Sequence, residues 1–217
     1  MSGMEKMNFD LQADAAKAVQ LQRDDAVWQH GRGSVSDGQD TNADGQPTCV
    51  LTDTANAIVI YFSRSGSTEL LAHMIAMQVA ADSLEIVVQK PYSQNYQQTL
   101  NRANYERLNQ RYPALNMQVP NLDQYQTVYL GYPVWAMTLS HPMTAFLKSY
   151  GSQLNNKKIV PFMTQGGYGA GDSVQQIQAL LHNQGIHNEM APSLVIDGNK
   201  VNRASSQIRQ WLNLVNR

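Results

Sequence analysis

The chain has 217 residues, of which 42% are hydrophobic and 15% are charged, and its formal net charge at pH 7 is −1. This length can bury one good hydrophobic core, and the sequence contains no apolar run of about 18 residues that would span a membrane. The single cysteine, Cys49, excludes an internal disulfide framework and a cysteine-based metal site. The amino terminus lacks the apolar core of a signal peptide, so we expect a cytoplasmic protein.

The chain divides near residue 55 into two parts of opposite charge. Residues 1–55 are polar and carry four basic and nine acidic residues, a net charge of −5, whereas residues 56–217 have a net charge of +4. A weakly apolar face predicts a helix over residues 11–28, with Trp28 as its natural anchor. We interpret residues 1–55 as an acidic N-terminal extension. It is a solvated tail, a segment that packs on its own domain, or one that reaches a partner subunit in a homodimer.

The second part begins with a buried strand that turns directly into a helix. Residues 58–61 are apolar or aromatic, residues 63–68 read Ser-Arg-Ser-Gly-Ser-Thr, and a helix is predicted over residues 67–80. Amide groups at a helix start carry the positive end of the helix dipole and bind anions. The hydroxyl groups can add donors, and Gly66 lets the backbone approach closely. The pattern predicts a site for a single phosphate group, and the alternative is an ordinary serine-rich helix cap.

Strands and helices alternate along the rest of the chain. Further strands are predicted near residues 84–88, 127–131, 158–163 and 194–197, and further helices near residues 142–150, 173–184 and 203–215. Alternation of this kind predicts a doubly wound parallel sheet with helices on both faces, a three-layer α/β fold.

A polar segment, residues 91–121, interrupts this alternation between the second and third strands. It contains a predicted helix over residues 94–110, which is either a surface helix or a cover over a ligand. Its candidates for ligand contact are Tyr92, Tyr96, Arg102, Tyr105 and Arg107.

Two later strands each end in a loop that suits a ligand. Residues 132–137 read Tyr-Pro-Val-Trp-Ala-Met, which places Trp135 at the carboxyl end of a buried strand, where open α/β folds bind ligands. Trp135 is either a flat stacking surface or a core residue. Residues 164–171 carry four glycines around Tyr168, which are costly in chain entropy unless the backbone must approach something closely. The alternative for this loop is a flexible turn.

The three loops together predict one ligand, because parallel strands deliver them to the same edge of the sheet. A phosphate site beside an aromatic ring and exposed backbone amides suits a phosphorylated ligand with a large flat ring. Flavin mononucleotide (FMN) matches both ends.

In these loops the chain resembles the flavodoxin-like FMN-binding proteins, in the subgroup with the patterns YFSRTGNT, GYPIWWG and TSGGSG. It has YFSRSGST at 61–68, GYPVWAM at 131–137 and TQGGYG at 164–169, in the same order and spacing. The resemblance covers residues 57–217 and implies FMN at the carboxyl edge of a five-stranded parallel sheet. It implies a phosphate held by Ser63, Arg64, Ser65, Gly66, Ser67 and Thr68. It implies a flavin ring flanked by Pro133, Val134, Trp135, Ala136 and Met137, and by Thr164, Gln165, Gly166, Gly167 and Tyr168.

The resemblance implies a flavoprotein oxidoreductase, for which three interpretations compete. In the first, the nicotinamide nucleotide NADH or NADPH reduces FMN, which passes electrons to a quinone-like or other small acceptor. In the second, the protein is a flavodoxin-type carrier of single electrons between redox protein partners. Such carriers are usually acidic, so the charge of +4 favours the first. Ala136 and Met137 replace a second Trp and a Gly, which keeps open a third, a binding module without cofactor.

The remaining polar residues give weaker signals. No histidine has metal-ligand spacing, and we predict no metal site. His141, next to the second loop, either donates a hydrogen bond to a substrate or faces solvent. No clustered basic stripe with interleaved aromatic residues occurs, so we do not expect nucleic-acid binding.

Overall fold

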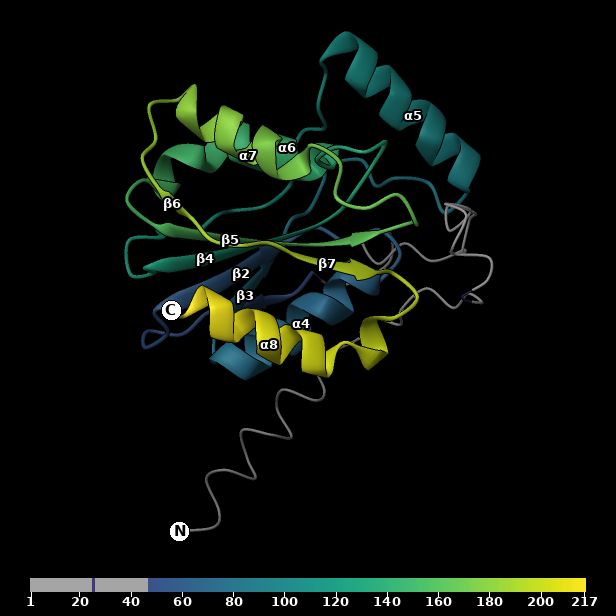
Figure 1. The fold of residues 1–217 in the computed structure, drawn as a ribbon. Helices are drawn as coiled ribbons and strands as arrows, with labels where there is room; N and C mark the ends of the chain where they lie inside the picture. The colour runs from purple at the N-terminus through teal and green to yellow at the C-terminus, as the bar shows by residue number, and fades with distance from the viewer. Residues whose placement is uncertain (1–24, 26–46) are drawn as a thin grey trace.

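A central sheet with helices on both faces makes three layers in the computed structural model, which describes residue 25 and residues 47–217 (Figure 1). Five strands run parallel: β2 (Ala57–Tyr61), β3 (Asp82–Glu85), β4 (Thr127–Pro133), β5 (Lys158–Gln165) and β7 (Leu194–Asp197). Their order across the sheet is β3-β2-β4-β5-β7, so the chain starts near the middle and winds to both edges. The predicted doubly wound parallel sheet is therefore confirmed.

Two short strands complete the sheet. β6 (Glu189–Met190) pairs with the start of β5, and β7 pairs with its end, so β6 and β7 are two halves of one edge position. β1 (Cys49–Val50) pairs antiparallel with β3 at the opposite edge. The sequence did not predict either, because two-residue strands carry no periodicity.

The parallel strands are buried on both faces, as expected for a sheet that helices cover on both sides. All five residues of β2 are buried. Ile58 and Ile60 belong to one hydrophobic cluster and Val59 and Tyr61 to another, because successive side chains point to opposite faces of the sheet.

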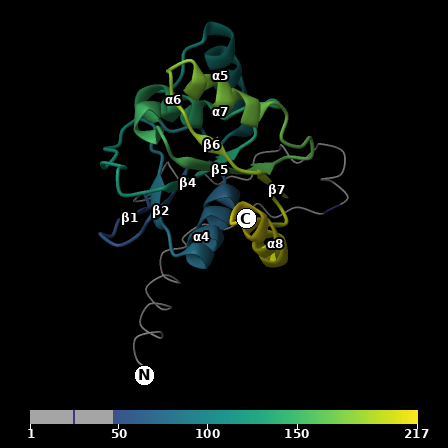
Figure 2. The same cartoon turned by 60° about the vertical axis from the view of Figure 1, so that its left-hand side comes forward.

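The helices divide between these two clusters. α4 (Ser67–Val79) and α8 (Ser205–Val215) lie side by side on one face, and α6 (His141–Tyr150) and α7 (Ser173–His182) cover the other (Figures 1 and 2). α5 (Tyr96–Asn109) stands apart from both layers, toward the end of the sheet where the strand arrows point. Short 3₁₀ turns at Gly151–Leu154 and Val201–Arg203 follow α6 and precede α8.

The second strand differs from its prediction. It spans Asp82–Glu85 instead of residues 84–88. Asp82 is buried yet satisfied, because its carboxylate accepts hydrogen bonds from the Thr52 amide at 2.8 Å and the Tyr125 hydroxyl at 2.7 Å. Val88, at the end of the predicted strand, lies outside the sheet; it is buried and forms an isolated bridge with Leu115. Val88 is buried because it packs in the hydrophobic core cluster that includes Ile58 and Ile60.

The predicted helix over residues 11–28 lies outside the described residues, apart from Asp25. The Asp25 carboxylate accepts hydrogen bonds from Asn199 at 2.8 Å and from Arg203 at 3.0 Å. Residues 47–55 contact the sheet through β1, and the Thr48 amide donates to Glu85 at 2.9 Å.

Candidate functional site

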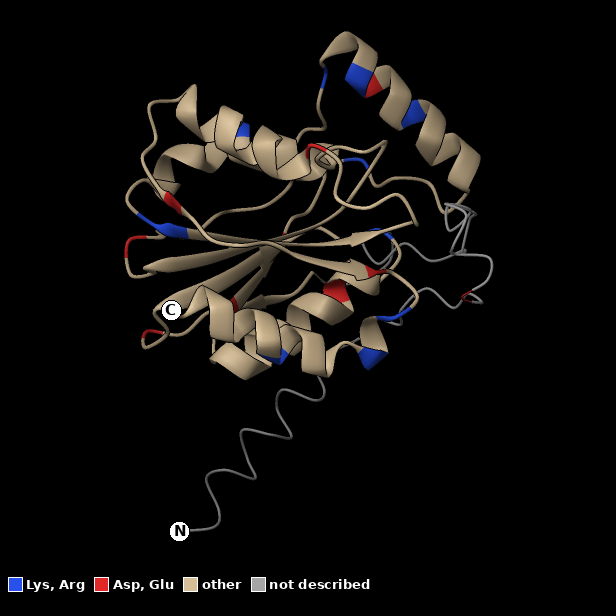
Figure 3. Cartoon of the chain, viewed as in Figure 1, with Lys and Arg blue, Asp and Glu red and all other residues tan. Residues whose placement is uncertain are grey.

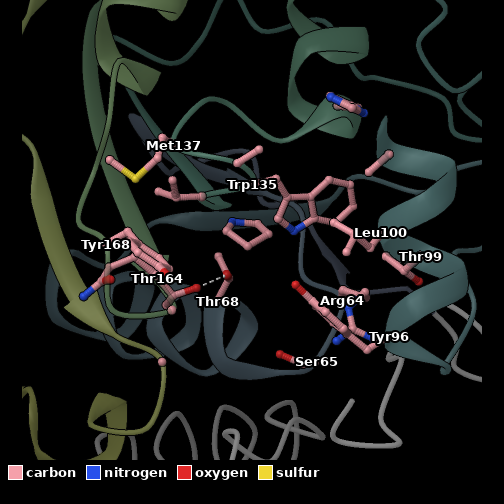
Figure 4. Close-up of a pocket in the computed structure, with 18 of the residues that line it drawn as sticks. Arg64, Ser65, Thr68, Tyr96, Thr99, Leu100, Trp135, Met137, Thr164 and Tyr168 are labelled. Carbon is pink, nitrogen blue, oxygen red and sulfur yellow. Dashed lines mark hydrogen bonds between the residues drawn. The ribbon is translucent and has the colours of Figure 1, made fainter. Parts of the chain in front are cut away.

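A cavity of about 360 Å³ opens at the carboxyl edge of the sheet, where the three predicted loops meet (Figure 4). This volume lies within the range of small-molecule sites. The predicted site residues that line the cavity are Arg64, Ser65, Ser67, Thr68, Pro133, Val134, Trp135, Ala136, Met137, Thr164, Gln165, Gly166 and Tyr168. The other three, Ser63, Gly66 and Gly167, belong to the same loops but do not line the cavity. The sheet topology thus brings together segments that are up to about a hundred residues apart in sequence.

The first loop directs the start of α4 at this cavity. Gly66 is the residue that precedes α4, with a φ of 95°, in the left-handed region that favours glycine. Its amide donates to the Ser63 hydroxyl at 3.1 Å, and its carbonyl accepts the first helical bond from Leu70 at 2.9 Å. No side chain caps α4, so the first helical turn presents its dipole to an anion.

Two hydroxyl groups of this loop brace the site. The Ser67 hydroxyl donates to the Gly198 carbonyl at 2.8 Å, and the Thr68 and Thr164 hydroxyl oxygens lie 2.7 Å apart. The Ser67 hydroxyl therefore donates its hydrogen bond within the protein, whereas the sequence predicted that it would donate to a phosphate. Gly198, which also lines the cavity, was not among the predicted residues. Gly198 could have been predicted, because it directly follows the last predicted strand and so lies at the edge of the sheet where the cavity opens.

The second loop turns tightly at the cavity wall. Trp135 and Thr138 exchange two backbone hydrogen bonds, at 3.1 and 3.0 Å, around Ala136 and Met137. These two residues have φ values of 50° and 65°, the pattern of a type I′ turn. Non-glycine residues rarely adopt this conformation and cost free energy there. The neighbouring loop supports the turn, because the Asp172 amide donates to the Met137 carbonyl at 2.9 Å.

The third loop is closed by its own glutamine. The Gln165 side-chain oxygen accepts from the amides of Gly167 and Gly169, and its amide nitrogen donates to Asp197. The sequence predicted exposed amides in this loop, but these two are bound to Gln165. Tyr168 remains 65% exposed at the rim, and Figure 4 shows it across the cavity from Trp135.

Trp135 combines the two roles between which the sequence left a choice. Its ring packs edge-to-face on Phe62 at 5.8 Å, Tyr92 at 4.9 Å and His141 at 5.8 Å. It is part of the packing around the main core, yet it also lines the cavity. Three ring contacts fix its orientation, so the surface that it presents is rigid.

Helix α5 forms the remaining wall, and one of its faces lines the cavity through Tyr96, Thr99, Leu100, Ala103, Asn104 and Arg107. These positions recur at the three- and four-residue spacing of a single helix face. Tyr105, a predicted ligand contact, instead faces solvent with 56% of its surface exposed. The sequence left a choice between a surface helix and a cover over a ligand. In the structure α5 is both, because one face lines the cavity and another is exposed to solvent.

A buried carboxylate anchors α5 to the domain. Glu106 accepts hydrogen bonds from the Tyr92 hydroxyl at 2.7 Å, from Nε of Arg102 at 2.8 Å and from Nδ1 of His141 at 2.8 Å. Burial alone would raise the Glu106 pKa, but these hydrogen bonds hold it below the usual value. Burial and the bond to Glu106 raise the pKa of Tyr92. Glu106 was not predicted as a site residue, because no sequence pattern connects it with a partner as distant as His141.

Fold and site define a flavodoxin-type α/β protein with a ligand pocket at the carboxyl edge of its sheet. A family model described as Flavodoxin matches residues 56–215, and the chain belongs to this family. None of the helices in the described part of the chain has the length and apolarity to span a membrane.

Solved structures share this fold. A protein from Bacteroides eggerthii assigned as a flavoprotein is 23% identical with a TM-score of 0.61, over 76% of this chain and 99% of that one. A similar protein from Bacteroides uniformis is 22% identical with a TM-score of 0.61, over 73% and 98%. A Lactobacillus acidophilus flavoprotein in complex with FMN is 18% identical with a TM-score of 0.51, over 69% and 98%. A comparison with curated proteins gave no significant match.

Proposed function

We propose that this chain binds FMN in the cavity and acts as an oxidoreductase that passes electrons from NADH or NADPH to a quinone-like or other small acceptor. FMN supplies the redox chemistry when bound, and the protein supplies binding, orientation and electrostatic tuning. The family membership and the FMN bound by the Lactobacillus acidophilus protein support this cofactor.

The residues present fit FMN at both of its ends. The backbone around Ser65 and the uncapped start of α4 suit a terminal phosphate. Trp135 and Tyr168 lie on opposite walls (Figure 4) and would flank the flavin ring. Ala136 and Met137 keep the turn that shapes one wall, although they lack the second aromatic ring of the subgroup. We expect that loss to weaken stacking by about 0.5–1.5 kcal/mol.

The main observation that favours an enzyme over a single-electron carrier is that helix α5 forms one wall of the cavity. A single-electron carrier needs only an exposed flavin edge, whereas a small acceptor needs a chamber beside the ring. The face of α5 that lines the cavity adds apolar and hydrogen-bonding side chains beside the three loops, which suits a small acceptor. Charge agrees, because residues 56–217 have a net charge of +4, and Figure 3 shows acidic and basic residues interspersed over the described chain.

One observation favours the carrier as a second candidate. Met137 is 45% exposed and Tyr168 is 65% exposed, and both lie at the rim of the cavity. Exposed apolar groups around a redox site suit contact with a protein partner.

Anaerobic reduction of the bound flavin distinguishes the oxidoreductase from the single-electron carrier. The purified chain is first titrated with FMN, and binding is followed by quenching of the flavin fluorescence. NADH or NADPH is then added without oxygen. Rapid bleaching of the flavin, followed by recovery on addition of benzoquinone, supports the enzyme. A bound flavin that neither nucleotide bleaches refutes it in favour of the carrier, and no quenching refutes the FMN site.

A further inference from the structure

His141 is the first residue of α6 and directly follows the second loop. It is 4% exposed, and it lines the cavity. A buried histidine at a ligand cavity differs from the solvent-facing residue that the sequence left as an alternative. Its surroundings therefore define what its ring can do.

One nitrogen of this ring is fixed by Glu106. Nδ1 lies 2.8 Å from Oε2 of Glu106. Because the Glu106 pKa is lowered by its hydrogen bonds, this carboxylate is ionised near neutral pH and can only accept. The proton between the two groups therefore belongs to Nδ1. A carboxylate in this position orients an imidazole and fixes which of its two nitrogens carries the proton.

The other nitrogen, Nε2, is the polar atom of this cavity-lining residue that Glu106 does not hold. Among the described residues no group hydrogen-bonds it, and it is not one of the sealed polar atoms without a partner. The ring itself cannot turn freely, because Trp135 packs against it at 5.8 Å and Tyr112 at 5.6 Å. The polar edge left for a ligand is therefore Nε2.

The charged and titratable groups around this ring come from several elements. Glu106 and Arg102 belong to α5, Tyr92 precedes that helix, and Tyr112 follows it. The Lys148 ammonium of α6 lies 4.8 Å from the centre of the Tyr112 ring. Arg107, the neighbour of Glu106 in sequence, lines the same cavity. Glu106 is the group in direct contact with the imidazole.

We propose that His141 is the proton donor to the reduced acceptor, with Glu106 as its positioning residue. This inference rests on the proposed function. Bound and reduced FMN would supply a quinone with a hydride equivalent, which is two electrons and one proton. The second proton comes from Nε2 of protonated His141, whose N–H bond breaks as the O–H bond of the neutral hydroquinone forms. The ring returns to its neutral form with Nδ1 still donating to Glu106, and solvent reprotonates Nε2.

The variant His141→Asn separates this role from a structural one. The asparagine amide can donate to Glu106 from the place of Nδ1, but it has no group at the place of Nε2. A residue that merely anchored α5 would therefore be replaced adequately. His182→Gln is the matched control, because His182 is exposed in the last turn of α7, away from the cavity.

The test uses the FMN-loaded chain reduced by light, so that it does not depend on the nicotinamide nucleotide. Reduced protein is mixed with benzoquinone, and flavin oxidation is followed by stopped-flow absorbance in H₂O and D₂O. For the wild type and His182→Gln we expect a rate that falls as pH rises and that slows in D₂O. For His141→Asn we expect a rate lower by about a hundredfold and independent of pH.

A second readout does not depend on activity. Nitrogen-15 NMR of histidine-labelled protein should show the Nδ1-protonated form of His141, and Glu106→Gln should shift this signal. An His141→Asn variant with the rate, pH profile and isotope effect of the wild type would overturn the inference alone, as would an Nε2-protonated neutral ring. Lack of FMN binding, or a wild type whose reduced flavin ignores benzoquinone, would overturn the proposed function and the inference with it.

Discussion

The close approach of the second and third loops at Gly171 makes a sharp prediction about the cavity wall. Gly171 has a φ of 56°, and a Cβ atom added to it would lie 1.7 Å from the Met137 carbonyl oxygen. Real Cβ contacts are essentially never closer than 3.0 Å. Gly171→Ala must therefore move the two loops apart and break the hydrogen bond from Asp172 to Met137, which is 2.9 Å long.

The expected loss of stability has three parts. An alanine in the left-handed region costs about 1–2 kcal/mol, and the lost hydrogen bond adds about 1 kcal/mol. Strain from the displaced type I′ turn brings the expected loss in free energy of unfolding to about 2–4 kcal/mol. FMN affinity should fall as well, because Ala136 and Met137 shape the wall that flanks the ring.

Gly185→Ala is the matched control. Gly185 has a φ of 72° in the turn after α7, and an added Cβ would meet nothing within 4 Å. It should lose only the conformational part, about 1–2 kcal/mol, and bind FMN as the wild type does. Urea unfolding and FMN fluorescence quenching measure both quantities. Equal losses of stability in the two variants, with equal FMN affinity, would refute the role of the loop contact.

Three further changes test other parts of the site. Gly66→Val should lower FMN affinity at least a hundredfold in the same titration, because a β-branched residue at a φ of 95° disrupts the phosphate turn; tight binding would refute that turn. Trp135→Ala should weaken FMN binding by about 0.5–1.5 kcal/mol in stacking, and unchanged affinity would show a purely structural ring. Glu106→Gln should lower the free energy of unfolding at pH 7 by about 1–3 kcal/mol. The folded-state pKa of Glu106 is lowered, so its contribution is present above the usual glutamate value of about 4.3 and is lost as pH falls through the lower folded value. Thermal unfolding at pH 7 and in acid should therefore show the gap between wild type and variant closing in acid, and a gap that stays constant would contradict this assignment.

The strands and the three loops could be predicted because their signals are local. A strand buried on both faces is a continuous apolar run, as in Ala57–Tyr61, and Gly66 follows directly where the backbone needs a positive φ. The alternation of strands and helices then permits few topologies, and in these the loops share one edge. The sequence by itself therefore determined the sheet, the place of the pocket and most of its lining.

The tertiary structure decided which groups meet inside that pocket. Glu106 lies 35 residues before His141, and their contact depends on how α5 docks, which no periodicity encodes. The same holds for Gly171, whose space is taken by a carbonyl of another loop, and for Ser67, whose proton is donated to Gly198. The sequence specifies the chemistry of each side chain, but packing between distant segments determines which group each of these residues contacts. The same packing between distant segments places one face of α5 against the cavity that the three loops line.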